Sequence, residues 1–269
     1  MRLVVTLLVR DELDIVEANV RHHLGSGASQ VIVTDNGSVD GTREVLAELA
    51  TRLPVTVIDE PSRGYEQAAW VTRMARLAAT EHGADWVINT DADELWWTEQ
   101  GDLAAVLGAT EPRFGVVEAP QLNFAPRHAE QRPDQLVLRW RRWATRKAAH
   151  RADPHVEIAQ GNHKVIAPRM AVDPDRSRIA VLHCPQRSFA QCERKIVDGT
   201  RAYRNSPDLP EEMGVHWRSL YEVWERGGLR DHWDHEIQVS PWRAVRLVAR
   251  RHLTIDTRLR STIRAALAP

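Results

Sequence analysis

Three aspartates, each at the end of a hydrophobic segment, are the first candidates for chemistry in this sequence. The three residues, with the segments that they end, are Asp35 (31–35), Asp59 (55–59) and Asp91 (85–91). Asp91 is followed by Ala92 and Asp93, so two carboxylates are spaced by one residue. Mg²⁺ and Mn²⁺ bind one or two carboxylates and complete their coordination with phosphate oxygens and water. The pattern therefore predicts a metal–phosphate site near Asp91 and Asp93, although any one of these residues alone could be a helix cap or a turn residue.

The segments that must position these aspartates alternate between strand and helix patterns. Unbroken apolar runs predict strands that are buried on both faces, and apolar residues at helical spacing lie between them. The expected strands are 3–9, 31–35, 55–59 and 85–91, and the expected helices are 13–24, 41–53 and 65–82. This alternation predicts βαβ units and a mostly parallel sheet, in which ligands bind at the carboxyl ends of the strands.

The pattern is weaker after residue 100. Shorter strands are expected at 115–124, 136–143, 163–168 and 178–183, and the pattern becomes helical from Ser188 onward. We therefore expect an α/β domain over residues 1–187 and a helical extension over residues 188–269 that packs on it.

Composition excludes several classes of protein. The 269 residues contain 36 Lys and Arg against 37 Asp and Glu, so the net charge of −1 argues against a dedicated nucleic-acid binder. The only cysteines are Cys184 and Cys192, and they form no paired framework. This favours a protein located in the reducing cytoplasm. No apolar run is long enough to span a membrane, and the first residues do not resemble a signal peptide. Ten Trp could stack on sugars, but Trp also commonly fills cores and interfaces.

Two common phosphate-binding patterns are absent. The sequence contains neither GxGxxG nor GxxxxGK[ST], so neither the dinucleotide fingerprint nor the phosphate loop of nucleotide hydrolases is present. If a nucleotide binds at the edge of the sheet, a metal ion or basic side chains must neutralise its phosphates.

The first hundred residues resemble a known enzyme family. The run MRLVVTLLVRDELDIVEANVRHHLGSGASQVIVTDNGSVDGT is similar to the opening of the family-two type glycosyltransferases, which have a GT-A fold. The resemblance is strongest to the branch with a V-R-D-E motif and a D-N-x-S-x-D-G-T turn, and VTDNGSVDGT (33–42) and DADEL (91–95) fit it in order and separation. RGYEQAAW (63–70) stands where the family has a loop near the nucleotide.

A fainter similarity covers part of the C-terminal half. GNHKVI (161–166), the run 182–203 and GVHWR (214–218) are similar to the C-terminal pattern of the same branch. The sequence departs from that pattern at Cys184, where an aromatic residue is expected, and residues 219–269 are unmatched.

The resemblance implies residues that bind the donor nucleotide and a metal ion. Thr6 and Asp35 match positions that contact the base and ribose, and Arg10 lies beside them at the end of the first strand. Asp91 matches the carboxylate near the ribose and the metal, and Asp93 matches the direct metal ligand. His183 stands where a histidine often completes the Mn²⁺ or Mg²⁺ site; its alternative is a hydrogen-bonded core position.

Further residues are implied for the diphosphate and the acceptor. Arg63, Arg187 and Lys195 are candidates to bind the diphosphate, with a solvent-exposed helix face as the alternative for Arg187 and Lys195. An inverting transfer needs a general base near the acceptor hydroxyl, and Glu157 and His163 are the candidates.

The resemblance thus implies a GT-A-fold, metal-dependent glycosyltransferase of the hexosyltransferase type that inverts the configuration at the anomeric carbon. The expected donor is a nucleoside-diphosphate sugar, with a UDP-sugar as first choice, and the acceptor is an unidentified glycan, lipid-linked or small molecule. The alternatives are a sugar-phosphate nucleotidyltransferase and a non-catalytic carbohydrate-binding protein. Residues 241–269 carry seven Arg against one Asp, so they either dock on their own domain or contact the inner face of a membrane.

Overall fold

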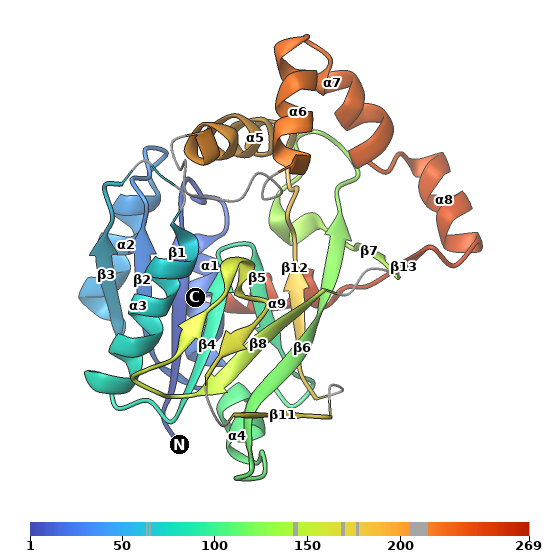
Figure 1. Ribbon diagram of the computed structural model, residues 1–269. Coiled ribbons are helices and arrows are strands. Elements are labelled where there is room, and N and C mark those ends of the chain that lie inside the picture. Colours follow the sequence, from blue (N-terminus) through green and yellow to red (C-terminus); the bar gives the residue numbers. More distant parts are fainter. Residues whose placement is uncertain are drawn as a thin grey trace.

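Four parallel strands form one half of the central sheet in the computed structural model (Figure 1). They are β1 (Leu3–Val9), β2 (Ala28–Asp35), β3 (Val55–Asp59) and β4 (Trp86–Asp91), in the order β3-β2-β1-β4. The structure describes residues 1–268 apart from residues 63, 65, 142–144, 168–169, 176–177 and 205–214. The predicted parallel arrangement of the first four strands is confirmed.

The other half of the sheet is mixed. Its strands are β5 (Glu94–Trp97), β6 (Phe114–Ala125), β7 (Leu138–Trp140), β8 (Arg146–Arg151), β11 (Ala171–Asp173), β12 (Ala180–His183) and β13 (Leu253–Ile255). Strand β8 lies antiparallel between β4 and β6, and β12 pairs parallel with β6 and antiparallel with β5. A separate hairpin consists of β9 (Glu157–Ile158) and β10 (Val165–Ile166).

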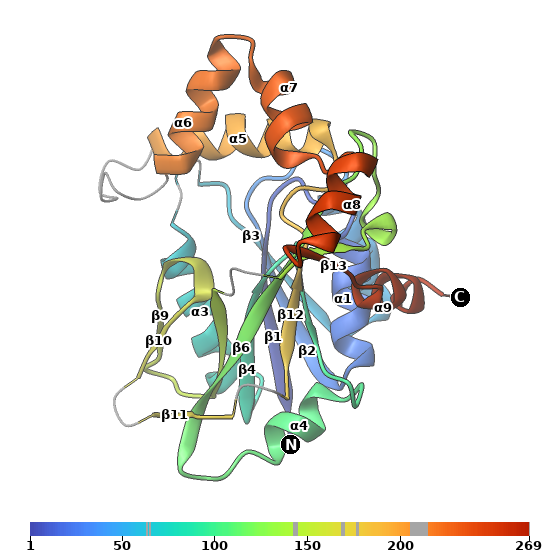
Figure 2. The same ribbon diagram turned by 90° about the vertical axis from the view of Figure 1, so that its right-hand side faces the viewer.

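Helices cover both faces of the sheet (Figure 2). They are α1 (Val16–Gly25), α2 (Thr42–Arg52), α3 (Gln67–Thr80), α4 (Leu103–Gly108), α5 (Phe189–Arg204), α6 (Val215–Glu225), α7 (Leu229–His232), α8 (Pro241–Ala249) and α9 (Arg258–Ala266). Helix α3 packs on one face, while α1, α2 and α9 pack on the other. The α/β architecture with a curled, mostly parallel sheet between helices, expected for a GT-A fold, is confirmed.

The strand sequences explain why both faces are covered. Successive side chains of a strand point to opposite faces, so β1 places Val4 against α3 and Val5 against the α1 side. Both residues are fully buried. A strand that is apolar on both faces is stable only between two layers, which is why the unbroken apolar runs predicted this fold correctly.

The segment from residue 188 to the C-terminus is not entirely helical. It includes β13, which pairs antiparallel with β7, and it ends in α9, whose Leu259 and Ile263 are buried in the same core as α1. The sequence also predicted one strand over 136–143; the structure instead has β7 at 138–140 and β8 at 146–151. No helix of the described residues is long and apolar enough to cross a membrane.

Helix α5 lies across the carboxyl ends of the parallel strands (Figure 1). The strand ends and this helix therefore face each other, and they enclose the site described below.

The buried His23 makes folding stability depend on pH. Its Nδ1 donates to the carbonyl of Asn19 at 2.9 Å, and its Nε2 accepts from the backbone N–H of Trp96 at 3.3 Å, so the ring is held neutral. Burial is the main reason that the pKa of His23 is lowered from 6.5 to about 3. Below pH 6.5 the unfolded chain therefore binds a proton that the folded chain does not bind.

We expect the free energy of unfolding to fall by up to about 1.4 kcal/mol per pH unit from this residue as the pH decreases below 6.5. Urea denaturation from about pH 7 to about pH 5.5 should show a shallower slope for His23→Gln than for the wild type. The control His128→Gln, at an exposed position, should keep the wild-type slope. Equal slopes in all three proteins would contradict this account.

Candidate functional site

The turn between β4 and β5 carries the acidic residues of the site. The side-chain amide of Asn19, on α1, donates to the carbonyls of Ala92 at 2.9 Å and Glu94 at 2.8 Å. The backbone N–H of Cys184 donates to the carbonyl of Asp93 at 3.0 Å. A helix and a distant strand therefore fix the backbone of this turn, and they fix the directions of its carboxylates.

Asp91 is the end of β4, and its carboxylate is held by three donors. Gln67 donates to Oδ1 at 2.8 Å and Asn162 donates to the same oxygen at 3.2 Å. The ammonium of Lys147 lies 3.1 Å from Oδ2. Both oxygens are therefore engaged by side chains of this chain.

Glu94 is fully buried beside Lys147. The Lys147 ammonium lies 2.8 Å from Oε1 of Glu94, and the amide of Gln121 donates to the same oxygen at 2.6 Å. Burial raises the pKa of Glu94 to about 8, although the Lys147 charge acts against this shift. Burial acts to lower the pKa of Lys147, but the carboxylates of Asp91 and Glu94 outweigh it and raise that pKa.

Asp93 is buried and ionised. The Lys195 ammonium, from α5, lies 2.6 Å from its Oδ2. Burial alone would raise the pKa of Asp93, but the positive charge of Lys195 holds this pKa well below its usual range. Lys195 also lies 3.8 Å from Glu12, in the loop after β1.

The orientation of His183 leaves two acceptor atoms facing each other. Its Nδ1 lies 2.7 Å from Oδ1 of Asn123, an oxygen that only accepts, so Nδ1 carries the proton and Nε2 carries a lone pair. That Nε2 lies 3.7 Å from Oδ1 of Asp93. Burial lowers the pKa of His183 to about 4, so the ring is neutral at pH 7.

This arrangement is suited to a cation. Ligand atoms of Asp93, Glu94 and His183 lie within 4.8 Å of one another. A carboxylate oxygen and an imidazole lone pair that face each other repel unless a positive ion lies between them. The Nδ1 hydrogen bond that fixes the tautomer is also typical of metal-binding histidines.

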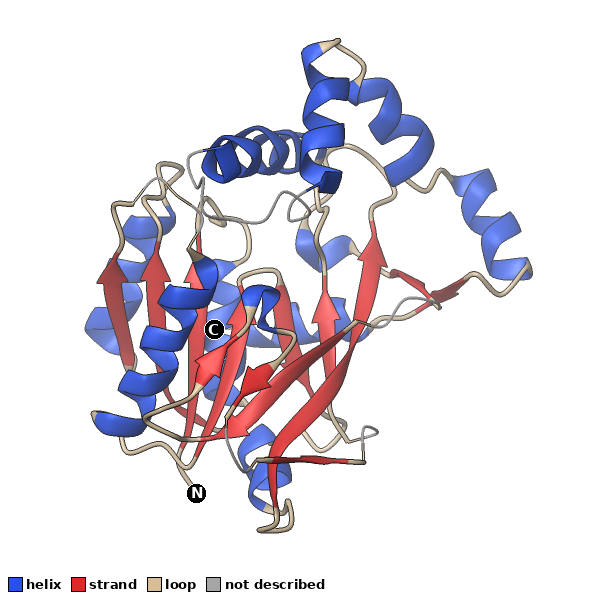
Figure 3. Cartoon of the chain, viewed as in Figure 1, coloured by secondary structure: helices blue, strands red, loops and turns tan. Residues whose placement is uncertain are grey.

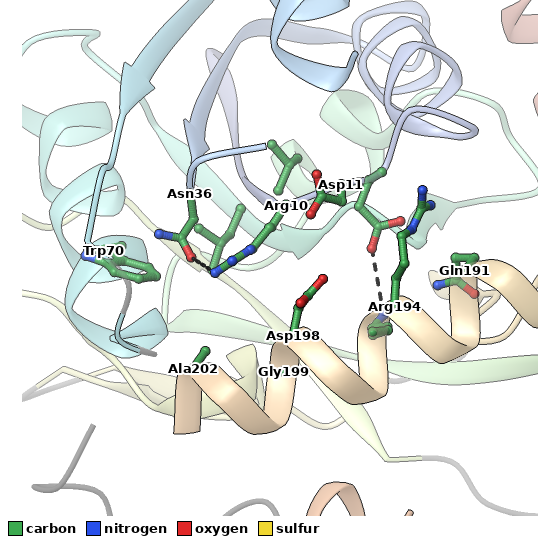
Figure 4. Close-up of a pocket in the computed structure, with 13 residues that line it drawn as sticks. Arg10, Asp11, Asn36, Trp70, Gln191, Arg194, Asp198, Gly199 and Ala202 are labelled. Carbon is green, nitrogen blue, oxygen red and sulfur yellow. Dashed lines mark hydrogen bonds and ion pairs between the residues drawn. The ribbon is translucent and has the colours of Figure 1, made fainter. Parts of the chain in front are cut away.

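Two hollows adjoin these residues. The larger, of about 590 Å³, is lined by the DADEL turn, by Lys147, His163 and His183, and by Trp217 and Leu220 of α6. The smaller, of about 160 Å³, lies between the carboxyl end of β1 and α5 (Figure 4). Glu12 and Lys195 line both hollows, so the two are neighbours.

The smaller hollow combines polar groups of the strand ends with a largely apolar lining. Arg10 and Asn36 point into it, with the Arg10 Nη1 3.5 Å from the Asn36 Oδ1, and the Trp70 ring forms another wall (Figure 4). Asp35 lies next to Asn36 and is buried. Its Oδ1 accepts from the Ser38 backbone at 3.3 Å, while its Oδ2 has no hydrogen-bond partner among the described residues.

Arg187 does not occupy the role or the exposed position that the sequence suggested for it. Its side chain is fully buried just before α5, and it forms ion pairs with Glu12 and, at 2.8 Å, with Asp14. Its Nη1 also donates to the carbonyl of Cys184 at 3.2 Å. Since its donors are directed at protein oxygens, Arg187 joins the loop after β1 to the start of α5 and is not available for a diphosphate.

Other candidate residues also lie away from the site. Thr6 is fully buried within the sheet, where its hydroxyl donates to Oδ1 of Asn89 at 2.8 Å, and it lines neither hollow. Glu157 is on the exposed hairpin, 3.9 Å from Arg76, and also lines neither hollow. Asp59 pairs with Arg43 at the surface, and Arg63 lies outside the described residues.

Several residues of the site were not among the candidates from the sequence. They are Asn19, Gln67, Glu94, Gln121, Asn123, Lys147 and Asn162. One signal could have identified Lys147: Lys occurs only at positions 147, 164 and 195 in a chain rich in Arg, and two of these three lysines contact the carboxylates of the site.

The chain matches a known protein family. The family described as Glycosyl transferase family 2 matches residues 11–166, which is more than half of the chain. The chain belongs to glycosyltransferase family 2. It is therefore a glycosyltransferase that uses a nucleotide sugar, and the family predicted from the sequence is confirmed.

Solved structures give more distant similarities. TarS from S. aureus in complex with UDP is 13% identical with a TM-score of 0.44, and the match covers 88% of this chain and 73% of TarS. Glucosyl-3-phosphoglycerate synthase from Mycobacterium tuberculosis, in complex with phosphoglyceric acid, is 22% identical with a TM-score of 0.33; that match covers 45% of this chain and 44% of the synthase. No curated protein matches this family 2 glycosyltransferase.

The buried Arg187 yields a stability prediction. Arg187→Met should lower the free energy of unfolding by about 3–5 kcal/mol, because it leaves Glu12 and Asp14 without their buried counter-charge. The control Arg52→Met breaks an exposed pair with Glu48 and should cost less than about 1 kcal/mol. Chemical denaturation measures both values, and an equally small cost for both variants would contradict a structural role for Arg187.

Proposed function

We propose that this enzyme transfers a sugar from a nucleoside-diphosphate sugar to an acceptor hydroxyl with inversion at the anomeric carbon, assisted by a divalent cation. The observation that carries the proposal is the pair of facing acceptors, Oδ1 of Asp93 and Nε2 of His183, 3.7 Å apart. Family membership favours glycosyl transfer over the two alternatives, nucleotidyl transfer and sugar binding without catalysis.

Asp93 and His183 would hold the cation, with Glu94 beside them. A bound cation would supply Lewis-acid stabilisation of the negative charge that develops on the leaving diphosphate. The imidazole ligand favours Mn²⁺ over Mg²⁺, because nitrogen donors bind the transition metal better. Asp91 was expected as a further ligand, but its two oxygens are occupied by Gln67, Asn162 and Lys147, so we assign it to orienting the turn.

We place the donor nucleoside in the smaller hollow. Arg10 and Asn36 supply polar contacts there, and the Trp70 ring supplies an aromatic wall. Asp35 precedes Asn36 in the chain, but it is buried and does not line this hollow. The diphosphate then lies toward Lys195, which lines both hollows. Lys195 is suited to hold phosphate oxygens as well as to orient Asp93, since an ammonium carries three donors. We keep a UDP-sugar as the first donor to test.

His163 is the general base of this proposal. Its Nδ1 lies 2.8 Å from the carbonyl of Arg146, which only accepts, so Nδ1 is protonated and Nε2 is free to take the proton of the acceptor hydroxyl. Partial burial of the ring lowers the pKa of His163, which keeps the neutral, basic form populated at pH 7. Glu157, the other candidate, lines neither hollow and is not retained.

Gly161 leaves room for the His163 ring. A Cβ on Gly161 would lie 2.7 Å from the His163 Cδ2, and the backbone φ of +75° at this position favours glycine.

The acceptor molecule would enter the larger hollow, where Trp217 and Leu220 of α6 provide an apolar wall.

The first test concerns the cation and the nucleotide together. Calorimetry of UDP binding with and without Mn²⁺ should show a metal-dependent gain in affinity for the wild type. In Asp93→Asn the Mn²⁺-dependent increase in UDP affinity should be at least about tenfold smaller, because the substitution removes a negatively charged ligand. The control Asp59→Asn changes the carboxylate at the end of β3, which pairs with Arg43 at the surface, and should keep the full gain. Equal, metal-independent binding by all three proteins would overturn the proposal.

A second prediction concerns His183. His183→Ala should weaken Mn²⁺ binding without nucleotide, as measured by electron paramagnetic resonance, and should reduce Mn²⁺-supported turnover more than Mg²⁺-supported turnover. A purely structural histidine would instead lower the melting temperature with no difference between the metals. The latter result would restrict the cation site to the carboxylates.

A further inference from the structure

Helix α8 has two apolar faces, and only one of them is packed. Ala244, Leu247 and Val248 face the chain's own core, where they pack with residues of β7 and β13. On the outer side, Trp242 is 86% exposed and Val245 is 66% exposed. Because these two residues are three positions apart in a helix, they lie on the same face.

Such an exposed aromatic side chain is unusual in this molecule. Of the Trp, Tyr and Phe side chains that the structure describes, Trp242 alone is among the exposed large hydrophobic residues. Figure 1 shows α8 at the outer edge of the molecule, beside β13. Ile255 is 68% exposed on β13, the strand that packs against α8.

The charge around this face has one sign. Residues 238–255 contain four Arg and no Asp or Glu. Arg243 is used within the chain, since its Nη1 donates to the carbonyls of His235 and Gln238. Arg246, Arg250 and Arg251 are exposed, and they have no ion pair with any residue that the structure describes.

Arg251 occupies a position where glycine would be more stable. Its φ is +59°, and it follows the last turn of α8, where helices commonly end with glycine. An arginine at this position therefore keeps a positive charge at some cost in backbone energy.

We propose that the outer face of α8 docks onto the surface of an anionic lipid bilayer. Trp is the side chain most suited to the membrane–water interface, and Val245 extends the apolar stripe beside it. Arg246, Arg250 and Arg251 are attracted to the negative headgroups. A second copy of this chain fits less well, because a two-fold interface centred on α8 would bring the two sets of arginines together.

The test is cosedimentation with vesicles of phosphatidylcholine alone or mixed with phosphatidylglycerol. The wild type should bind the anionic vesicles, release at high salt, and leave neutral vesicles unbound. Trp242→Ser should reduce binding to anionic vesicles strongly. The double variant R246Q/R250Q should bind roughly 25-fold more weakly, at about fivefold for each charge.

Two further variants separate docking from folding and from net charge. R52Q/R226Q removes two exposed arginines outside α8 and should bind like the wild type. Arg251→Gly should weaken binding about fivefold while the melting temperature rises, because glycine tolerates the positive φ.

Four results would overturn the proposal. They are equal binding to neutral and anionic vesicles, unchanged binding of Trp242→Ser, equal losses for R52Q/R226Q and R246Q/R250Q, and a wild-type oligomer that Trp242→Ser converts to monomer in sedimentation velocity. The last result would assign the face to a second copy of the chain.

Discussion

The buried guanidinium of Arg187 connects two parts of the chain that are far apart in the sequence. Glu12 and Asp14 come from the loop after β1, while Arg187 stands between β12 and α5, 173 residues beyond Asp14. With these contacts α5 is held across the strand ends, and only in that position can Lys195 reach both Asp93 and Glu12. The two hollows of the site have α5 or its neighbours as one wall, so their shape depends on the two ion pairs of Arg187.

The charges around the DADEL turn are nearly, but not fully, balanced by the chain itself. Five carboxylates, of Glu12, Asp14, Asp91, Asp93 and Glu94, contact the three cations Arg187, Lys147 and Lys195. With every group ionised, the excess is two negative charges, which is the charge that a divalent cation would neutralise. Without a cation, protonation of Glu94 reduces the excess of negative charge, because burial raises the pKa of Glu94 to about 8. The same low-dielectric surroundings therefore favour either a proton or a metal ion at this place.

Local patterns were sufficient to predict the parallel strands and the DADEL turn, but not the partners of individual polar side chains. The apolar runs identified β1 to β4, and the strand ends placed Asp35 and Asp91 at one edge. Thr6 was misplaced because a strand buried on both faces gives no pattern to show whether its one polar residue reaches the edge. Its partner Asn89 is 83 residues away. Lys147 was missed because β8 inserts antiparallel beside β4, a pairing that no local signal indicates. The burial of Arg187 was not predicted because it depends on Glu12 and Asp14, two acidic residues near the start of the sequence.

The path of the chain after β12 has a consequence for how this enzyme can change over evolution. The segment from α5 to α8 leaves the core at β12 and returns to it through β13 and α9, whose Leu259 and Ile263 are buried beside α1. It is therefore a long excursion anchored at both ends. Doubling the length of such a loop costs only about 0.6 kcal/mol of closure entropy. Insertions, deletions or exchanges of helices within this excursion can thus alter the α6 wall of the larger hollow while the strands that carry the aspartates keep their packing.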